Sequence, residues 1–349
     1  MIKKFAKLPD GRTAHLYILK NGDLEAHITN FGATLHRLYV PDANGNIADI
    51  VLGFDTPEEY INSTTFFGAA IGRNSNRVKA GQFRLNGKTY QMGKNDGLNN
   101  LHSGPDFFKD RLWNVEQVSE RSITLSLDSP DGDQGFPGNA RICVTYTLED
   151  GGVLCISYDA VCDQDTVFNM TNHSYFNLAG HNKPEKAMDM FLSMPARFFT
   201  VADAESIPTG ECRPVDCTPM DFRIPKPIGR DINADYDPLI LQNGYDHNFE
   251  VHANPCAILS DATSGRCMTI ATDCPGIQFY SGNFLEGETG KDGVKYCFRG
   301  GVCLETQYYP NALNHPDWKK PITKAGQPYH SETRFIFSIN HNTTDEEDD

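Results

Sequence analysis

The chain has 349 residues, with 39% hydrophobic and 22% charged side chains, 30 glycines and 20 prolines. This composition is typical of a globular protein rich in turns and excludes a fibrous or disordered chain. A formal net charge of -15 would repel the phosphates of nucleic acids and anionic lipid surfaces. We therefore expect a neutral small-molecule ligand, and neither a nucleic-acid nor a membrane partner.

The first residues carry positive charges, but Pro9 and Asp10 interrupt the apolar stretch that a signal peptide needs. No later run is long and apolar enough to span a bilayer. We expect a cytoplasmic protein whose ten cysteines are buried thiols rather than a disulfide framework. The sequence is compatible with a monomer or a dimer.

Helical signals are scarce, whereas strand signals recur along the chain. The segment Thr56-Pro57-Glu58-Glu59 has the N-cap residue, the proline and the acidic first turn of one short helix. Residues 83–90 form two alternating arms joined by Asn86-Gly87, which predicts a β-hairpin. The segments 122–127, 141–148 and 153–161 are predicted to be successive antiparallel strands.

Glycine and proline mark two long irregular stretches, residues 128–138 and 208–237, which are predicted to be loops. Short strands separated by turns favour an all-β sandwich or barrel. Large all-β architectures exceed 200 residues as single domains, so we expect residues 1–342 to form one domain. Residues 343–349 are an acidic tail, expected to be disordered because it has no apolar surface to bury.

Two stretches place a titratable group in apolar surroundings. His173 lies in Thr171-Asn172-His173-Ser174-Tyr175, and Glu305 follows the apolar residues Val302-Cys303-Leu304. Each group alone has an ordinary structural interpretation, a hydrogen-bonded core histidine or a salt-bridged strand carboxylate. Together they form a candidate acid and base pair.

Further polar residues stand in loops or between aromatic residues. Arg73 and Arg77, each taken alone, are expected to be solvated, as arginine usually is. His102 lies in a turn-rich loop, and Asp246 and Gln278 stand beside aromatic residues. Aromatic faces combined with such donors and acceptors suit a sugar, which has apolar ring faces and a rim of hydroxyls.

In combination, these motifs make the chain resemble the aldose 1-epimerases, the galactose mutarotase family. The resemblance covers nearly the whole chain except the acidic tail. It rests on several motifs in the family's order: residues 30–34 (Asn-Phe-Gly-Ala-Thr), 72–78 (Gly-Arg-Asn-Ser-Asn-Arg-Val), 100–104 (Asn-Leu-His-Ser-Gly), 172–178 (Asn-His-Ser-Tyr-Phe-Asn-Leu), 246–249 (Asp-His-Asn-Phe), 276–285 (Gly-Ile-Gln-Phe-Tyr-Ser-Gly-Asn-Phe-Leu) and 304–307 (Leu-Glu-Thr-Gln).

The resemblance implies a large antiparallel β-sandwich with few short helices, the galactose mutarotase-like supersandwich, and a sugar cleft on one face. It implies that Glu305 is the catalytic base and His173 the catalytic acid. It implies sugar-binding roles for six further residues, namely Asn76, Arg77, His102, Tyr175, Asp246 and Gln278.

The implied reaction interconverts the α and β anomers of a free hexose, galactose or glucose or both, by ring opening and closure. One base and one acid suffice for it, so we expect no metal and no cofactor. An ionised Glu305 is expected to hold a proton on His173 at neutral pH. Ser103 and Asn311 depart from the commonest family pattern and are expected at most to shift substrate preference.

Three alternatives have distinct signatures. A glycoside hydrolase on the same fold would use two carboxylates, and Asp246 could supply the second. A hexose-6-phosphate 1-epimerase would need additional arginines or lysines around the phosphate. A non-catalytic carbohydrate-binding protein would not need both His173 and Glu305.

Overall fold

The computed structural model describes residues 1–340, and antiparallel strands dominate its architecture. This confirms the predicted all-β class with few short helices. The predicted acidic tail, residues 343–349, and the last two residues of the predicted domain 1–342 lie outside the described residues. The assignment of one domain stays a prediction.

Three large sheets make up most of the molecule. The first has five strands in the order β1 (Ile2–Lys7), β2 (Thr13–Asn21), β3 (Leu24–Thr29), β4 (Thr34–Pro41) and β5 (Ile47–Asp49). The second has nine, in the order β11 (Asn114–Val118), β12 (Ser122–Ser129), β13 (Ala140–Glu149), β14 (Val153–Cys162), β28 (Tyr329–Ile339), β24 (Arg266–Thr272), β23 (Ala257–Ser260), β18 (Phe191–Ser193) and β21 (Lys226–Pro227).

The third sheet has six strands in the order β17 (Tyr175–Phe176), β26 (Val302–Gln307), β25 (Gly276–Tyr280), β22 (Asp246–Glu250), β19 (Phe198–Ala202) and β20 (Pro208–Pro214). Four two-stranded ribbons complete the strands: β6 (Ala70–Ile71) with β16 (Thr171–Asn172), β7 (Arg77–Val78) with β10 (Asn100–Leu101), β8 (Gln82–Leu85) with β9 (Lys88–Gln91), and β15 (Thr166–Val167) with β27 (Ile322–Thr323).

The helices are short. They are α1 (Pro57–Asn62), α2 (Asp237–Leu241) and the 3-10 turns Lys79–Gly81, Phe108–Asp110, Asp133–Gly135, Pro184–Asp189, Ile228–Arg230, Lys291–Gly293 and Ala312–Asn314. Within residues 1–340 we find no helix with the length and apolar character that crossing a membrane requires.

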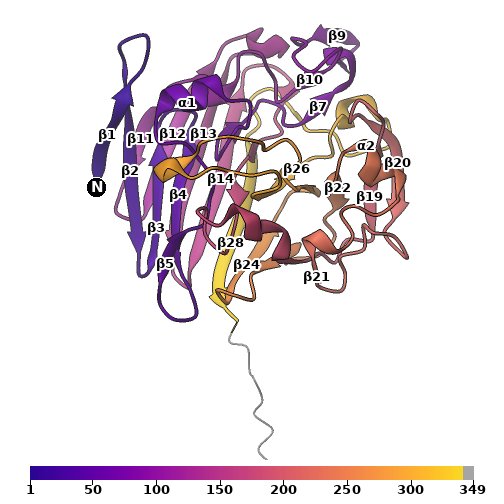
Figure 1. Cartoon of the computed structure of the whole chain (residues 1–349). Coiled ribbons are helices and arrows are strands. Elements are labelled where there is room, and N and C mark those ends of the chain that lie inside the picture. Colours follow the sequence, from indigo (N-terminus) through magenta and orange to yellow (C-terminus); the bar gives the residue numbers. More distant parts are fainter. Residues whose placement is uncertain (341–349) are drawn as a thin grey trace, which may run out of the picture.

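The nine-stranded sheet is the central layer, with the five-stranded sheet at one end of it and the six-stranded sheet at the other (Figure 1). Alternation within each strand explains the packing, because every second side chain points to the same face. On β13, Ile142, Val144 and Tyr146 are buried in the main hydrophobic core, which also contains Ile277 and Leu304 of the six-stranded sheet. One continuous core therefore joins the three sheets.

Local sequence signals agree with the structure. The predicted hairpin is the β8–β9 ribbon, turning at Asn86-Gly87 with both residues at positive φ, as a type I′ turn requires. The predicted helix is α1, where the Thr56 side chain and Glu59 form a reciprocal capping box. The segments 122–127, 141–148 and 153–161 are confirmed as β12, β13 and β14.

Two predictions of irregular or exposed structure are wrong. Residues 208–214 form the edge strand β20, paired with β19, and residues 226–227 form β21, so the predicted loop 208–237 is only partly irregular. Prolines are tolerated there because both strands lie at sheet edges. Arg73, expected to be solvated, is completely buried.

Arg73 is buried because its guanidinium binds Ser129, the last residue of β12, and the loop 130–138 that follows. It donates hydrogen bonds to the carbonyl oxygens of Ser129 (2.6 Å), Gly138 (2.9 Å) and Pro137 (3.0 Å), and to the hydroxyl of Ser129 (2.9 Å). A guanidinium has five N–H donors in a fixed plane and can satisfy several buried carbonyls at once. This contact anchors the segment that continues to Asn76 and Arg77.

We predict that Arg73→Lys lowers the free energy of unfolding by at least about 2 kcal/mol, because a lysine leaves several buried carbonyls without a donor. The matched control is Arg84→Lys, which changes an exposed arginine on β8 and should leave stability within about 0.5 kcal/mol of the parent. Urea unfolding of both variants measures the difference. Equal midpoints for the two variants would contradict the anchoring role.

Candidate active site

The central strands of the six-stranded sheet carry the candidate base. On β26, Val302 and Leu304 face the main core, so the alternating residues Cys303 and Glu305 face the other side of the sheet. Every residue of β26 is buried, because loops cover this second face as well. The strand therefore places one carboxylate in a dry environment.

The neighbouring strands add polar groups to the same face. Gln278 of β25 lies opposite Glu305 in the register, and β22 follows next to β25. The amide nitrogen of Gln278 donates a hydrogen bond of 2.7 Å to Asp246, the first residue of β22. Burial raises the pKa of Asp246, and the Arg77 guanidinium and this hydrogen bond oppose the rise.

A cavity of about 310 Å³ opens over this face. It brings together seven of the eight predicted site residues; Gln278 stands behind Asp246 instead of lining the wall. The lining residues are Thr64, Thr65, Phe66, Asn76, Arg77, Asp96, Leu101, His102, His173, Tyr175, Asp246, Tyr280, Phe284, Leu285 and Glu305. A cavity of this size suits a small ligand.

The imidazole of His173 is held between two aromatic rings. Phe66 and Tyr175 stack on it with centroid distances of 5.7 and 5.1 Å and interplanar angles of 21° and 22°. Its Nε2 atom lies 3.8 Å from Oε1 of Glu305, and its Nδ1 atom lies 3.5 Å from Sγ of Cys303. The two ring nitrogens therefore have different partners.

Burial sets the protonation of this pair. Desolvation lowers the pKa of His173 to about 4 and raises the pKa of Glu305 well above its usual range, where the nearby Asp246 carboxylate adds to the rise. Both shifts run against the expectation that an ionised Glu305 holds a proton on His173. In a dry pocket two neutral groups cost less than two charges, so burial favours the arrangement in which both groups are neutral.

Arg77 is the cation of the cavity wall. Its Nε donates a hydrogen bond of 2.7 Å to Asp96, and one terminal nitrogen lies 3.6 Å from Asp246. Its positive charge lowers the pKa of Glu305 and so favours the ionised carboxylate. The second oxygen of Glu305, Oε2, is buried and has no hydrogen-bond partner within residues 1–340.

His102 is fixed by the loop that carries Asn76. The backbone N–H of Asn76 donates a hydrogen bond of 3.1 Å to Nδ1 of His102, so the neutral ring carries its proton on Nε2. Burial lowers the pKa of His102 well below its usual value. His102 is therefore a neutral hydrogen-bond donor.

The two departures from the commonest family pattern both support this loop from outside the cavity. Ser103 Oγ donates to the carbonyl of Asn74 at 2.8 Å and accepts from its N–H at 2.9 Å. The Asn311 N–H donates to the carbonyl of Arg77 at 2.9 Å, and its side-chain oxygen accepts from Lys79 at 3.0 Å. An effect of either residue on substrate preference stays a prediction.

Sequence reasoning missed several wall residues. Phe66, whose backbone has a left-handed conformation, stacks on His173. It lies outside the motifs on which the family resemblance rests. Tyr280 and Phe284 lie in the quoted motif 276–285 and had a detectable signal. Phe284 is 73% exposed, which is unusual for an aromatic side chain, and it stacks on Tyr280 at the cavity.

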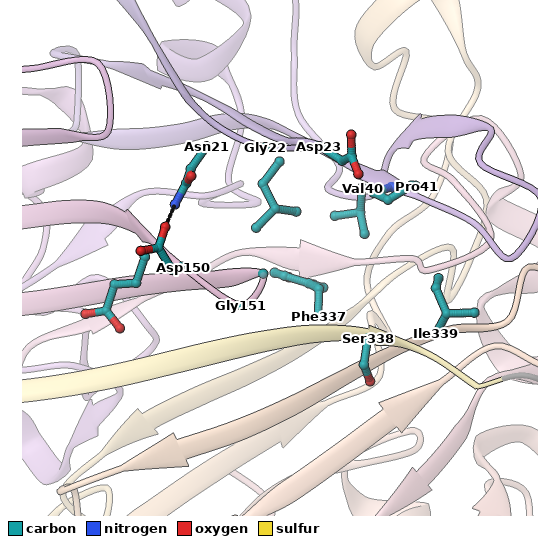
Figure 2. A pocket seen from close by; sticks show the side chains of 13 residues that line it. Asn21, Gly22, Asp23, Val40, Pro41, Asp150, Gly151, Phe337, Ser338 and Ile339 are labelled. Atoms are coloured by element: carbon teal, nitrogen blue, oxygen red, sulfur yellow. Dashed lines mark hydrogen bonds between the residues drawn. The ribbon is translucent and has the colours of Figure 1, made fainter.

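A second cavity, of about 230 Å³, lies between the β2–β3 and β13–β14 turns and the end of β28 (Figure 2). Leu24, Val40 and Phe337 give it an apolar lining, and Asn21 donates a hydrogen bond of 3.2 Å to Asp150 across it. Asn21 and Asp150 bind each other, and Glu149 binds Arg334, so none of these three side chains is left without a partner. The first cavity therefore carries the candidate chemistry.

Comparisons with known proteins agree with this geometry. The model of the family described as "Aldose 1-epimerase" matches residues 15–335. The chain belongs to the aldose 1-epimerase family. It is 41% identical to the galactose mutarotase of Sus scrofa over 96% of this chain and 97% of that protein. It is 34% identical to the aldose 1-epimerase of Escherichia coli K12 over 95% of this chain and 97% of that protein.

Solved structures of the family share the fold. The aldose epimerase homologue from C. elegans superposes with a TM-score of 0.87 and 32% identity, covering 94% of this chain and all of that one. The galactose 1-epimerase from Lactobacillus acidophilus NCFM gives a TM-score of 0.86 and 27% identity, covering 98% of this chain and 99% of that one. The predicted mutarotase-like sandwich is thereby confirmed.

Two histidines and a carboxylate of this aldose 1-epimerase also resemble a metal-binding group. One ligand atom from each of His102, His173 and Glu305 lies within 4.8 Å of the others. A metal-bound histidine needs a free lone pair on the bound nitrogen. His102 uses its lone pair to accept the Asn76 N–H, so the nitrogen facing the cavity carries a proton. These residues therefore do not fit a divalent metal.

We predict that the protein retains no zinc or nickel at this group. Equilibrium dialysis against micromolar Zn²⁺ should give the same stoichiometry for the parent chain and for Glu305→Gln, because the proton on Nε2 of His102 leaves this group one ligand short. One additional equivalent bound by the parent chain and lost in Glu305→Gln would contradict the prediction.

Proposed function

We propose that this protein interconverts the α and β anomers of a free hexose, galactose or glucose or both, with Glu305 as base and His173 as acid. The observation that carries the proposal is the approach of His173 Nε2 to Glu305 Oε1, 3.8 Å apart and buried in a cavity of hexose-accommodating size. Full-length similarity to proteins named galactose mutarotase and aldose 1-epimerase supports the same reaction.

Ring opening requires one proton to leave the C1 hydroxyl and one to reach the ring oxygen. Glu305 takes the first proton, and His173 delivers the second from Nε2. Rotation about the C1–C2 bond then presents the other face of the aldehyde, and the same two groups run the transfers in reverse to close the opposite anomer. Each proton taken by one group is matched by a proton given by the other.

The dry pocket favours the opening step. Before opening, Glu305 is negative and His173 is positive; after opening, both are neutral. Burial raises the pKa of Glu305 and lowers the pKa of His173, so the double transfer removes two charges that desolvation penalises. Arg77 opposes this by favouring ionised Glu305, and thereby keeps the charged starting state accessible.

The remaining site residues hold hydroxyls. Asp246, fixed by Gln278 and Arg77, accepts hydrogen bonds from the sugar rim. His102 donates from Nε2 to an oxygen on which negative charge develops during opening. Asn76 and Tyr175 lie on the wall beside these groups, and Phe284 and Tyr280 offer apolar surface to the ring face.

Phosphorylated hexoses are poorer candidates. Among the lining residues that the structure describes, Arg77 is the one permanent cation, whereas Asp96, Asp246 and Glu305 are carboxylates. Arg77 already binds Asp96. A phosphate would enter an acidic cavity without a free guanidinium to receive it.

We predict that Glu305→Gln and His173→Asn each lower turnover at least about a hundredfold while sugar still binds, because general acid–base groups contribute factors of that order. Asp246→Asn and Gln278→Ala should chiefly raise KM. Polarimetry of freshly dissolved α-anomer, with spontaneous mutarotation subtracted, measures the rates. A Glu305→Gln enzyme with near-parental turnover would identify the wrong base.

We predict a bell-shaped dependence of the mutarotation rate on pH. Catalysis requires that His173 and Glu305 together carry one proton, so the rate falls when the pair gains a second proton or loses the one it has. Falling pH adds a second proton as it passes the pKa of His173, about 4, and the rate decreases there. Rising pH removes the shared proton as it passes the raised pKa of Glu305, and the rate decreases again. An acid limb near pH 6.5 would show that burial does not control His173.

A further inference from the structure

The support of the catalytic histidine lies on the same strand as the catalytic base. Cys303 and Glu305 are two residues apart on β26, so their side chains point to the same face, about 7 Å apart along the strand. Cys303 is completely buried, and its Sγ lies 3.5 Å from Nδ1 of His173. Leu304 between them faces the core.

The orientation of the His173 ring gives its two nitrogens different neighbours and therefore different roles. Stacking between Phe66 and Tyr175 restricts the plane of the ring. Within that plane Nε2 faces Glu305 and Nδ1 faces Cys303. To give a proton at Nε2 and take it back, the neutral ring must keep its other proton on Nδ1. Nδ1 therefore needs an acceptor. Sγ of Cys303 is the side-chain atom beside it, and the backbone of His173 itself also interacts with the ring and raises its pKa, against the larger effect of burial.

We propose that Cys303 is a positioning residue for the catalytic acid: its sulfur accepts the Nδ1–H of His173 and so holds Nε2 as the working nitrogen. This proposal rests on the proposed mutarotase function and adds a residue to its machinery. A thiol sulfur is a weak, uncharged acceptor. It fixes the tautomer without stabilising the imidazolium as a carboxylate would, so His173 remains a ready proton donor.

The chemistry of the surroundings agrees with a protonated thiol in this role. Burial raises the pKa of Cys303 well above its usual value, and the nearby carboxylates of Glu305 and Asp246 raise it further. A thiolate would bind the Nδ1 proton strongly and would turn His173 into a poor acid. The neutral sulfur avoids this.

The test compares Cys303→Ala, which removes the acceptor, with Cys303→Ser, which keeps one. Cys256→Ala is the matched control, because Cys256 is also a buried thiol, bonded to the carbonyl of Ile270 at 3.4 Å and lying outside the cavity wall. We expect Cys303→Ala to lower kcat about tenfold or more with little change in KM, as loss of an outer supporting partner does elsewhere. Cys303→Ser and Cys256→Ala should keep most of the turnover.

Two further measurements, the pH profile of the rate and the nitrogen NMR spectrum of His173, distinguish a role of Cys303 in positioning His173 from a nonspecific disturbance of the structure. The acid limb should move to higher pH in Cys303→Ser, whose oxygen supports the imidazolium better, and to lower pH in Cys303→Ala. Nitrogen NMR of His173 should show the proton on Nδ1 in the parent chain and in Cys303→Ser, and a shift toward Nε2 in Cys303→Ala.

The spectrum is independent of turnover, so a protein without mutarotase activity but with the Nδ1 proton in place would refute the proposed function and leave the contact standing. A parent chain with its neutral proton on Nε2 would overturn the role of Cys303. So would a Cys303→Ala enzyme with unchanged kcat and acid limb. If Cys303→Ala fails to fold, the NMR spectrum of the parent chain and the acid limb of the pH profile of Cys303→Ser still test the role of Cys303.

Discussion

Exclusion of water around His173 and Glu305 is the constraint on which the rest of the site depends. In water the two groups would rest as a charged pair. In the pocket, desolvation lowers the pKa of the histidine and raises the pKa of the glutamate, so burial favours the neutral arrangement. The proposed reaction passes between these two arrangements, which makes the dryness of the pocket a part of the chemistry.

The sheet supplies this dryness through strand alternation. On β26, Val302 and Leu304 face the main core, and Cys303, Glu305 and Gln307 face the other side of the sheet, where Glu305 lines the cavity; every residue of the strand is buried. A group on a central strand cannot move toward solvent without disrupting the ladders with β17 and β25. The same rigidity keeps the acid, held from Cys303, at a fixed distance from the base two residues away.

The other wall of the cavity is made of loops, whose positions are fixed by contacts outside the cavity. Arg73 binds the end of β12 and the loop 130–138, Ser103 binds Asn74, and Asn311 binds the segment from Arg77 to Lys79. Asn76, His102 and Ser103 have positive φ angles, a conformation that is uncommon for residues other than glycine and persists where the surroundings enforce it. Dense hydrogen bonding thus gives these loops the precision of the sheet.

The sequence by itself determined the local elements and the chemical inventory. Asn86-Gly87, the Thr56 cap and the alternation of β12 to β14 act over a few residues, so they could be read directly. The family motifs named most of the polar residues that line the cavity, whereas Thr64, Thr65 and Asp96 lie outside those motifs. Tertiary structure decided what burial controls: Arg73 lies inside, desolvation raises the pKa of Glu305, and β20 pairs as an edge strand. The partner of each His173 nitrogen was likewise decided there, because residue 173 meets residues 66, 303 and 305 only after folding. Solvation and contact between distant segments have no signature in a short stretch of sequence, and these two quantities set the chemistry of the site.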